Sequence, residues 1–456
     1  MKRIEKFVFL TLLVALVVPA SGAAQTAHAA SATSGSATVL SGNGSAQAAP
    51  PPKVFKVGAS VRLRTEIRNN FKFGSAAVGN DEQYLLTQFR VNLRWSPATR
   101  AMVFVEIQDA RIFGEEGIDQ VATPNIFADE LDLRGAYLQV DLSSGHLPVD
   151  LTVGRQKFNL GAQRLVSSLE WVNTARVWDG IRLDLGRTDE RTLNVFASKL
   201  VPVNPREFNW HDLTGNRMFD SYFYGAYFTD FGLVLGGQLE AYWLFRHQSE
   251  AGDGVQTLGG RLTATRDAWD AELEAAVQFG TWGDETHRGS MFHAALGYTA
   301  IDLNASRFGV VYNFGSGDGD PNDGTHATFD NLYPLNHAFY GYMDFFALQN
   351  LHNIEATFNT SFGGGFAAEV AYQGFWLVHQ NTDAWYNAGA GVVRQATQDV
   401  ASHVGSEIDI ILRRSLWQER VALEAGYGRF LTGQYVRSTG PSTDAYFFYL
   451  QAKISR

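Results

Sequence analysis

Apolar and polar residues alternate with a period of two through long parts of this chain. From Val57 to Ile67 every second position is apolar or β-branched, and the positions between are mostly polar or charged. The same alternation returns in residues 89–95, 233–246 and 269–279. Alternation places one kind of side chain on each face of a β-strand. Segments of about ten residues are long enough for a tilted strand to cross a bilayer, so the pattern favours membrane strands over those of a soluble sandwich.

The links between these segments alternate in length. Short links occupy residues 96–99, 143–148, 187–190, 230–232, 266–268, 300–302, 362–365 and 415–419. Mostly longer links occupy residues 69–83, 112–129, 158–175, 201–217, 247–254, 281–289, 316–349, 379–403 and 431–443. An outer-membrane barrel has short periplasmic turns and long outer loops. Nine long links with eight short ones between them imply about 18 strands, with both termini in the periplasm.

The predicted fold is therefore all-β, a transmembrane antiparallel up-and-down β-barrel formed by residues 54–456. Residues 339–346 could form a further strand, but we assign them to the seventh long link. Residues 1–29 have basic residues before a short apolar run and then small residues, which is typical of a secretory signal peptide. Residues 30–53 are rich in Ser, Ala and Gly, which predicts a flexible periplasmic leader.

Composition narrows the class of protein further. The absence of cysteine excludes a small disulfide-stapled module, and the net charge of −10 argues against a nucleic-acid partner. Aromatic residues gather near predicted strand ends, as in the interfacial girdles of membrane barrels, although aromatics also favour strands in general. The expected girdle residues are Trp95, Tyr222, Tyr224, Trp269, Trp282, Tyr298, Tyr312, Trp376, Trp417, Tyr427, Phe447 and Phe448.

Catalytic and metal sites have little support in the sequence. Histidines lie in predicted outer loops, at His211, His287, His326 and His337, but no spacing selects a Ser–His–acid set. We therefore expect no enzymatic activity and no cofactor. Residues 318–324 begin like a calcium loop, yet the glycine comes one place late and position twelve is Phe329 rather than glutamate. An acidic surface turn is the better interpretation, and we expect no metal site.

Two stretches carry a family resemblance. The first contains Gly154-Arg155-Gln156, then Gly161 with Gln163-Arg164-Leu165-Val166, then Trp171, Asn173, Arg176 and Asp179-Gly180; the second is Asn331-Leu332-Tyr333-Pro334-Leu335-Asn336-His337, followed by Gly341 and Asn350-Leu351. From about Phe55 onward the chain resembles the alginate-export family of outer-membrane β-barrels. The resemblance implies a basic pore for a negatively charged polysaccharide. It also implies contact with outer-membrane lipids and lipopolysaccharide, and a periplasmic polysaccharide-secretion complex as a candidate partner.

Arginines are the candidate pore residues, because the guanidinium group binds carboxylates bidentately. Alternation along the first strands places five arginines on the inward face: Arg62, Arg64, Arg68, Arg90 and Arg94. The family stretch adds Arg155, Arg164 and Arg176, and the strand that follows it adds Arg182. The alternative is a mixed charge network that only holds the barrel rigid, with Glu66, Glu106, Asp109 and Asp184 as neutralising partners. Acidic residues predominate on the inward faces of the second half, which predicts a transverse field across the lumen.

The sequence thus predicts an outer-membrane channel for passive export of an anionic exopolysaccharide such as alginate. Residues 158–175 and 316–349 are the best candidates for a gate, since both are long and carry the family motifs, whereas the predicted periplasmic turns are too short to plug the pore. A porin that takes up small anionic solutes or oligosaccharides is the alternative within the same architecture. An adhesin or a barrel enzyme would be alternatives from other classes.

Overall fold

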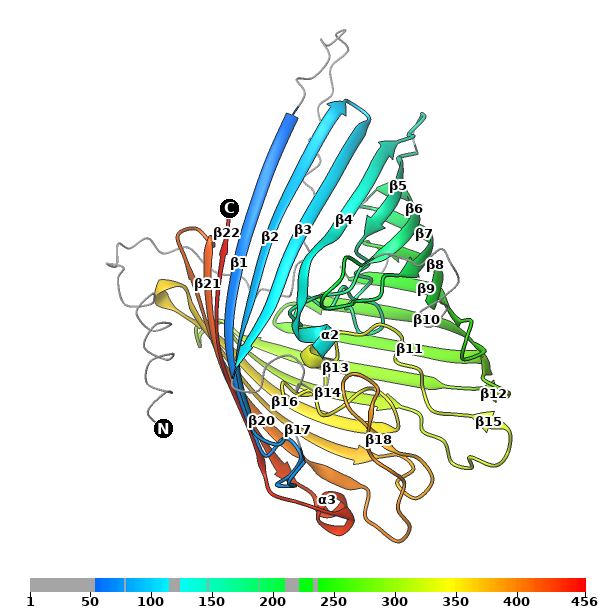
Figure 1. Cartoon of the computed structure of the whole chain (residues 1–456), viewed down its shortest axis with the longest axis vertical. Helices are drawn as coiled ribbons and strands as arrows, with labels where there is room; N and C mark the ends of the chain where they lie inside the picture. The colour runs from blue at the N-terminus through cyan, green and yellow to red at the C-terminus, as the bar shows by residue number, and fades with distance from the viewer. Residues whose placement is uncertain are drawn as a thin grey trace.

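The computed structural model describes residues 54–77, 79–114, 124–145, 147–187, 189–209, 221–232 and 237–456. The predicted signal peptide, the leader and His211 lie outside the described residues. In the described part of the chain, 18 long strands form one antiparallel sheet that closes on itself. Closure comes from β1 against the last strand, β22, in a register that runs from Ser60↔Ser455 to Asn69↔Tyr446, and Figure 1 shows these two strands side by side.

The barrel strands follow one another around the ring in chain order. They are β1 (Val54–Asn69), β2 (Glu82–Ala98), β3 (Ala101–Gly114), β4 (Asp129–Asp141), β5 (Val149–Gln156), β6 (Trp178–Arg187), β7 (Arg191–Leu200), β8 (Ser221–Asp230), β9 (Gln238–Gln248), β10 (Asp253–Arg266), β11 (Trp269–Trp282), β13 (Ser290–Ala300), β14 (Ser306–Gly315), β16 (Leu351–Phe362), β17 (Phe366–Leu377), β20 (His403–Leu416), β21 (Val421–Thr432) and β22 (Ala445–Ser455). These bounds agree with most of the predicted short and long links to within a few residues. The exception is β9, which begins at Gln238 and not directly after the predicted link 230–232; residues 233–236 lie outside the described residues.

The long links contain several short helices and strands. They are the helices α2 (Pro124–Phe127) and α3 (Gln434–Thr439), the 3-10 turn η2 (Asn336–Ala338), and the short strands β12 (Glu285–His287), β15 (Thr325–His326), β18 (Trp385–Tyr386) and β19 (Val392–Arg394). The 3-10 turn η3 (Gly363–Gly365) lies in a short link. Residues 339–346 form no strand, which agrees with their assignment to a loop. In the ranges described above, no helix has the length and apolar character to cross a membrane.

The predicted two-faced strands are confirmed by burial. On β1 the apolar residues Val57, Val61 and Leu63 are exposed on the outer surface, whereas Arg64 and Glu66 are buried inside. The outer surface is therefore the apolar one, as a barrel wall in contact with lipid requires. Trp269, Tyr298, Trp417, Tyr427 and Phe448 are exposed, as expected of girdle residues.

Phe447 does not belong to the girdle that the sequence suggested. It is 2 % exposed and packs inside the barrel against Phe71 and Tyr449. Successive residues of a strand point to opposite faces, so Phe447 and its neighbour Phe448 cannot both face lipid. The prediction for Phe447 was wrong for this reason.

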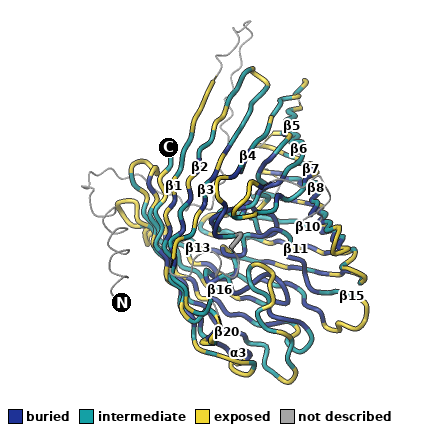
Figure 2. Tube along the Cα trace, in the orientation of Figure 1, coloured by how far each residue is buried: buried dark blue, intermediate teal, exposed yellow. Residues whose placement is uncertain are grey.

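Two long links fold into the barrel instead of projecting from it. We name them the β5–β6 loop (residues 157–177) and the β14–β16 loop (residues 316–350). Both carry buried apolar side chains, among them Phe158 and Val166 in the first and Phe329 and Tyr333 in the second. A parallel bridge joins Val166 to Tyr333. Figure 2 shows buried stretches both along the strands and in the loops within the ring.

Candidate functional site

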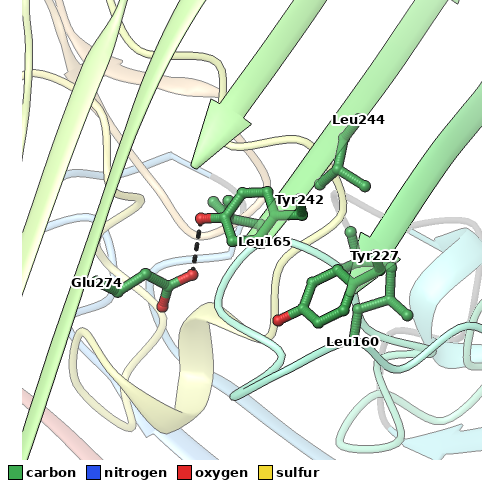
Figure 3. Close-up of a pocket in the computed structure, with 7 residues that line it drawn as sticks. Leu160, Leu165, Tyr227, Tyr242, Leu244 and Glu274 are labelled. Atoms are coloured by element: carbon green, nitrogen blue, oxygen red, sulfur yellow. Dashed lines mark hydrogen bonds between the residues drawn. The ribbon is translucent and has the colours of Figure 1, made fainter. Parts of the chain in front are cut away.

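The β5–β6 loop folds into the interior and meets strands β8 and β9 at Gly161. This glycine has φ +53°, and a Cβ there would clash with the Tyr227 hydroxyl and with Glu240. Only glycine fits both the left-handed backbone and the close approach. A small cavity remains where the loop meets strands β8, β9 and β11 (Figure 3), and its lining consists of Leu160, Leu165, Val166, Tyr227, Tyr242, Leu244 and Glu274.

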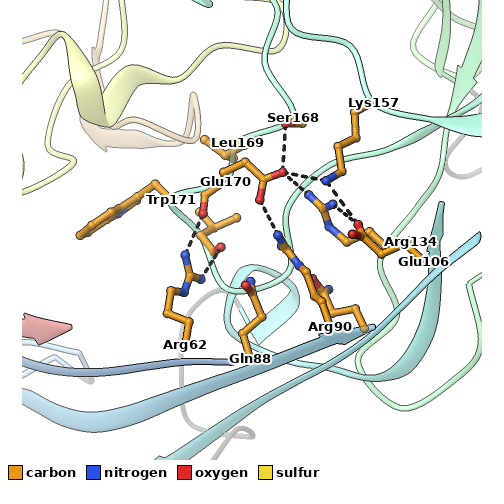
Figure 4. Close-up of polar contacts among 12 residues, drawn as sticks. Arg62, Gln88, Arg90, Glu106, Arg134, Lys157, Ser168, Leu169, Glu170 and Trp171 are labelled. Carbon is orange, nitrogen blue, oxygen red and sulfur yellow. Dashed lines mark hydrogen bonds and ion pairs between the residues drawn. The ribbon is translucent and has the colours of Figure 1, made fainter. Parts of the chain in front are cut away.

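On its other side the loop is held by arginines of β1 that bind its backbone carbonyls. Arg62 donates to the carbonyl oxygens of Glu170 at 2.8 Å and Val172 at 2.9 Å. Arg64 donates to the Trp171 carbonyl at 2.7 Å, and its guanidinium carbon lies 3.9 Å from the centre of the Trp171 ring. Arg62 and Arg64 are both buried. These two predicted pore residues therefore hold the loop in this structure. Figure 4 shows the contacts of Arg62.

Asn173 and two glutamines extend this attachment. The Asn173 side chain donates to the carbonyls of Thr87 and Phe127 at 3.0 and 2.8 Å. Gln88 donates to the Asn173 carbonyl at 2.6 Å, and Gln108 to the Thr174 carbonyl at 2.8 Å. The backbone of an irregular loop inside a barrel needs such partners, because unpaired buried polar groups are costly.

Glu170 lies at the centre of a cluster of cations shown in Figure 4. Its Oε2 is 2.6 Å from Arg90, and its Oε1 is 2.6 Å from Arg134 and 3.2 Å from Lys157. A second carboxylate, Glu106, lies 3.0 Å from Arg134 and 3.3 Å from Lys157. Three cations thus surround two carboxylates. We name this group of five side chains the Glu170 cluster.

The protonation of the cluster follows from these contacts. Burial alone would raise the pKa of the Glu170 carboxyl, but Arg134, Arg90 and Lys157 outweigh it and hold the pKa well below its ordinary value. Burial, together with the charge of Arg134, lowers the pKa of Lys157. The Glu170 side chain nevertheless keeps 44 % of its surface exposed toward the lumen. Glu170 is therefore a charged carboxylate that lumen water can reach.

Three further predicted arginines are also occupied by partners from the loops or the wall. Arg155 binds Asp179 at 2.8 Å and the Asn209 carbonyl at 2.8 Å. Arg164 reaches Glu272 at 3.1 Å and Glu274 at 3.2 Å. Arg68 binds Glu66 at 2.9 Å.

Each of the other three predicted arginines, Arg176, Arg182 and Arg94, has at most one ion-pair partner among the residues that the structure describes. Arg176 donates to the Ser167 carbonyl at 3.1 Å, and burial lowers its pKa to about 10. Arg182 pairs with Asp184 at 2.9 Å while 29 % of its side chain stays exposed. Arg94 is exposed and forms no ion pair with any residue of the described ranges. Arg94 and Arg182 are therefore the predicted residues that remain open to the lumen; whether any of the predicted arginines binds substrate stays a prediction.

The far side of the lumen carries carboxylates on β16, β17, β20 and β21. We name it the acidic wall, and its members are Glu355, Glu369, Glu407, Asp409 and Glu424. The Met343 amide of the β14–β16 loop donates to Glu407 at 2.9 Å. Asp409, two residues further along β20, is also buried. Arg413 binds Glu369 at 2.7 Å and Glu424 at 2.8 Å.

The two inserted loops meet near the middle of the lumen. The rings of Trp171 and His337 stack with centroids 3.6 Å apart and planes 12° apart, and Tyr342 contacts His337 edge-on at 4.5 Å. Each loop therefore supports the other, and together they narrow the channel.

Sequence reasoning missed Arg134, Lys157 and Glu170. Lys157 and Glu170 lie within the family stretch but outside its quoted motifs. Arg134 lies at an irregularity between β3 and β4, where the register shifts between Glu106 and Ile107. A β-bulge changes which face of the sheet the following residues occupy. The period-two alternation of the sequence therefore does not reveal that Arg134 lies beside Glu106.

In the described ranges, no group of three or more His, Cys, Asp or Glu side chains could hold a metal ion. The aspartate side chains of residues 318–324 accept hydrogen bonds from backbone amides of the same turn. Asp318 accepts from the Asp320 amide at 3.1 Å, and Asp323 accepts from the Thr325 amide at 2.7 Å. These are the contacts of a polar turn.

Known structures share this architecture. The chain is similar to Pseudomonas aeruginosa OccK3 (OpdO), with 16% identity, a TM-score of 0.57, and coverage of 88% of this chain and 95% of that one. It is similar to P. aeruginosa OccD3 (OpdP), with 10% identity, a TM-score of 0.60, and coverage of 90% and 93%. It is also similar to P. aeruginosa OpdK, solved with vanillate, with 12% identity, a TM-score of 0.60, and coverage of 88% and 98%.

No match was found among curated protein sequences. The model of the alginate export family matches residues 54–450, which is nearly all of the barrel. With the closed barrel and the porin-like neighbours, this match shows a β-barrel channel of the outer membrane. The chain belongs to the alginate export family.

Proposed function

We propose that this channel passes an anionic polysaccharide such as alginate out of the cell by passive diffusion. The observation that carries the proposal is the excess of cations at the constriction, where Arg90, Arg134 and Lys157 face only two carboxylates. Fixed cations in a narrow lumen raise the local concentration of anions. Membership of the alginate export family supports the same substrate class.

The exposed arginines would meet the polymer first. Arg94 lies toward the short-turn end of β2, where Lys56 is its neighbour in the β1–β2 register, and Arg182 lies midway along β6. With both termini in the periplasm, Arg94 and Lys56 face the periplasmic entrance and Arg182 lies deeper in the lumen. A uronate carboxylate would pass from them to the constriction above, and water would let it exchange between sites.

Single-channel conductance in a planar bilayer, before and after addition of polymannuronate, tests the proposal. We expect anion selectivity and concentration-dependent block, which should weaken on the order of tenfold in the double variant Arg94→Gln/Arg182→Gln. Arg266→Gln is the matched control, because Arg266 is the last residue of β10 and 81% of its side chain is exposed. Cation selectivity without block by any uronate would overturn the polysaccharide assignment.

A porin for small anionic solutes is the second candidate. The stacked Trp171 and His337 rings narrow the lumen, and the similar barrel OpdK was solved with vanillate, an aromatic carboxylate. Uptake of monomeric carboxylates into liposomes, combined with the absence of block by polymer, would favour this candidate.

The remaining expectations concern partners and chemistry. The exposed apolar belt would contact membrane lipids and lipopolysaccharide, and a periplasmic polysaccharide-secretion complex would deliver the polymer to the short-turn end. The channel would act without covalent chemistry. Phospholipid or peptide hydrolysis by the purified protein would contradict this expectation.

A further inference from the structure

The Glu170 carboxylate contacts the surrounding cations in the same way as the carboxylate of a bound ligand would. One oxygen contacts Arg90 and the other contacts Arg134 and Lys157, all within 3.2 Å. Two oxygens shared among several cationic donors is the arrangement that proteins use to bind carboxylates. Yet 44 % of the side chain remains exposed toward the lumen. Solutes in the lumen can thus reach Glu170 and Lys157, while Arg90 and Arg134 are buried behind them.

The cations hold their positions without Glu170. Arg90 donates to Gln108 at 2.8 Å, while Arg134 and Lys157 both contact Glu106 at 3.0 and 3.3 Å. If the Glu170 carboxylate left, three cations would face a single carboxylate. The site would then carry a net charge of two positive units and would favour another anion.

The Glu170 side chain can also move without the loop. The backbone of this segment is held by other groups, because Arg62 binds the carbonyls of Glu170 and Val172, and Arg64 binds the Trp171 carbonyl. A rotation of one side chain is therefore enough to vacate the site. Rotamer changes of exposed side chains are fast compared with the passage of a solute.

We propose that Arg90, Arg134 and Lys157 form a carboxylate-binding subsite, and that Glu170 is its resident competitor, which yields to a carboxylate of the solute. The inference rests on the proposed function in one respect, the carboxylate class of the solute. Competition from Glu170 lowers the apparent affinity of the subsite. In a transport channel this has a use, since binding must be weak enough for the solute to leave.

Glu170→Gln tests the proposal, because it removes the charge and keeps the shape of the side chain. We would measure binding of galacturonate monomer to the refolded protein in detergent by calorimetry, with galactose as the neutral comparison. We expect galacturonate to bind about tenfold more tightly to Glu170→Gln than to the wild type, as for a site that is otherwise free about one-tenth of the time. Galactose binding should not change.

Glu369→Gln is the matched control. Glu369 lies in the same lumen on the acidic wall and pairs with Arg413 at 2.7 Å, so its replacement changes the lumen charge equally but leaves the subsite alone. Adding Lys157→Met to Glu170→Gln should abolish the gain in affinity, since Lys157 is 33 % exposed and lies beyond the end of β5. Equal affinities for galacturonate in the wild type and Glu170→Gln, or an equal gain in Glu369→Gln, would overturn the proposal.

The two proposals fail in different ways. Tighter galacturonate binding in Glu170→Gln, with no block by polymannuronate in any variant, would support the subsite and overturn polysaccharide export. Block of the wild type by polymannuronate, with galacturonate affinity unchanged by Glu170→Gln, would support export and overturn the subsite.

Discussion

The two loops that enter the barrel differ in the contacts that stand out in their attachment. The β5–β6 loop presents backbone carbonyls to Arg62, Arg64, Gln88 and Gln108. The β14–β16 loop has polar contacts too, such as the Asp330 amide donating to Gln278 at 2.7 Å, and it adds extensive aromatic packing. Its Phe346 ring stacks on Phe375 of the wall with centroids 3.9 Å apart, and also on Trp385 with centroids 5.3 Å apart.

This difference shows that most lumen charges serve the fold before they serve a solute. An arginine that faces the lumen is usually interpreted as a contact for an anion, but here the buried Arg62 and Arg64 satisfy the carbonyls of an irregular segment. In the acidic wall, Glu407 accepts one loop amide, whereas Glu369 and Glu424 pair with Arg413 of the wall itself. The polar attachment should therefore depend on individual side chains more strongly than the aromatic attachment does.

The largest effect is expected from Arg64→Met. Arg64 is almost fully buried, pairs with Glu66 at 2.7 Å and holds the Trp171 carbonyl. Breaking such a pair should lower the free energy of unfolding by about 3–5 kcal/mol. Urea unfolding in detergent, followed by tryptophan fluorescence, measures this loss. Open-channel conductance should rise as well, because the β5–β6 loop loses one of its attachments to the wall.

Arg182→Met is the comparison for Arg64→Met. Arg182 has Asp184 as its carboxylate partner and stays partly exposed, so the expected loss is at most about 1 kcal/mol. If both variants lose the same stability, the carbonyl contacts of Arg64 do not hold the loop.

The sequence could predict the inward face of Arg64 but not what it binds. Parity along β1 follows from the alternation of residues 57–67, and the long links follow from where the alternation stops. The Arg62–Glu170 contact joins residues 108 positions apart. A carbonyl oxygen is present at every residue, so nothing in the sequence distinguishes the carbonyls that an arginine will bind. Arg134 was missed because a bulge interrupts the period on which the parity argument depends.

Acid should loosen the β14–β16 loop while the β5–β6 loop stays attached. Two histidines of the outer links lie close together. The Nδ1 atom of His326 in β15 is 3.0 Å from the Nδ1 atom of His287 in β12. Burial lowers the pKa of His287 to about 3, assisted by His326 and Arg246. Burial also lowers the pKa of His326, although Asp318, Asp383, Glu285 and Asp330 oppose this.

A histidine whose pKa falls on folding contributes stability that is complete above its unfolded pKa, about 6.5, and is lost as the pH falls toward the folded value. At pH 4 the loss for His287 should be roughly 3 kcal/mol. The pKa of Glu170 is depressed, so its contribution persists above about pH 4.3 and disappears only as the pH falls through the folded value.

Hydrogen exchange, corrected for the intrinsic rates, compares the two loops at pH 7 and pH 4.5. Amides of residues 285–290 and 325–330 should lose protection at the lower pH, and amides of residues 168–175 should keep it. In His287→Gln, the protection of residues 285–290 and 325–330 should differ less between pH 7 and pH 4.5 than it does in the wild type. Equal loss of protection in both loops would show that acid acts on the whole barrel.

A smaller effect is expected from Glu407→Leu. The substitution removes the acceptor of the Met343 amide at 2.9 Å, and an unsatisfied buried amide costs about 1–3 kcal/mol. Glu407→Gln keeps an acceptor and should lose less, by the same unfolding measurement. If the leucine variant is more stable than the wild type, the cost of burying this carboxylate exceeds what its hydrogen bond contributes.

The smallest effect concerns the aromatic attachment itself. Phe346→Leu and Phe375→Leu, made singly and together, form a double-mutant cycle on the stacked pair. The coupling energy should be about 0.5–1.5 kcal/mol, as for stacked rings beyond their buried area. Phe308 and Phe358 provide the comparison, because their centroids are 5.0 Å apart and Phe308 is exposed on the outer surface. Lipid can replace a lost contact there but not within the barrel, so the outer pair should couple more weakly. Equal coupling of the two pairs would mean that the rings do not fix the β14–β16 loop, and its position would then depend on Met343 and on the stacking of His337 against Trp171.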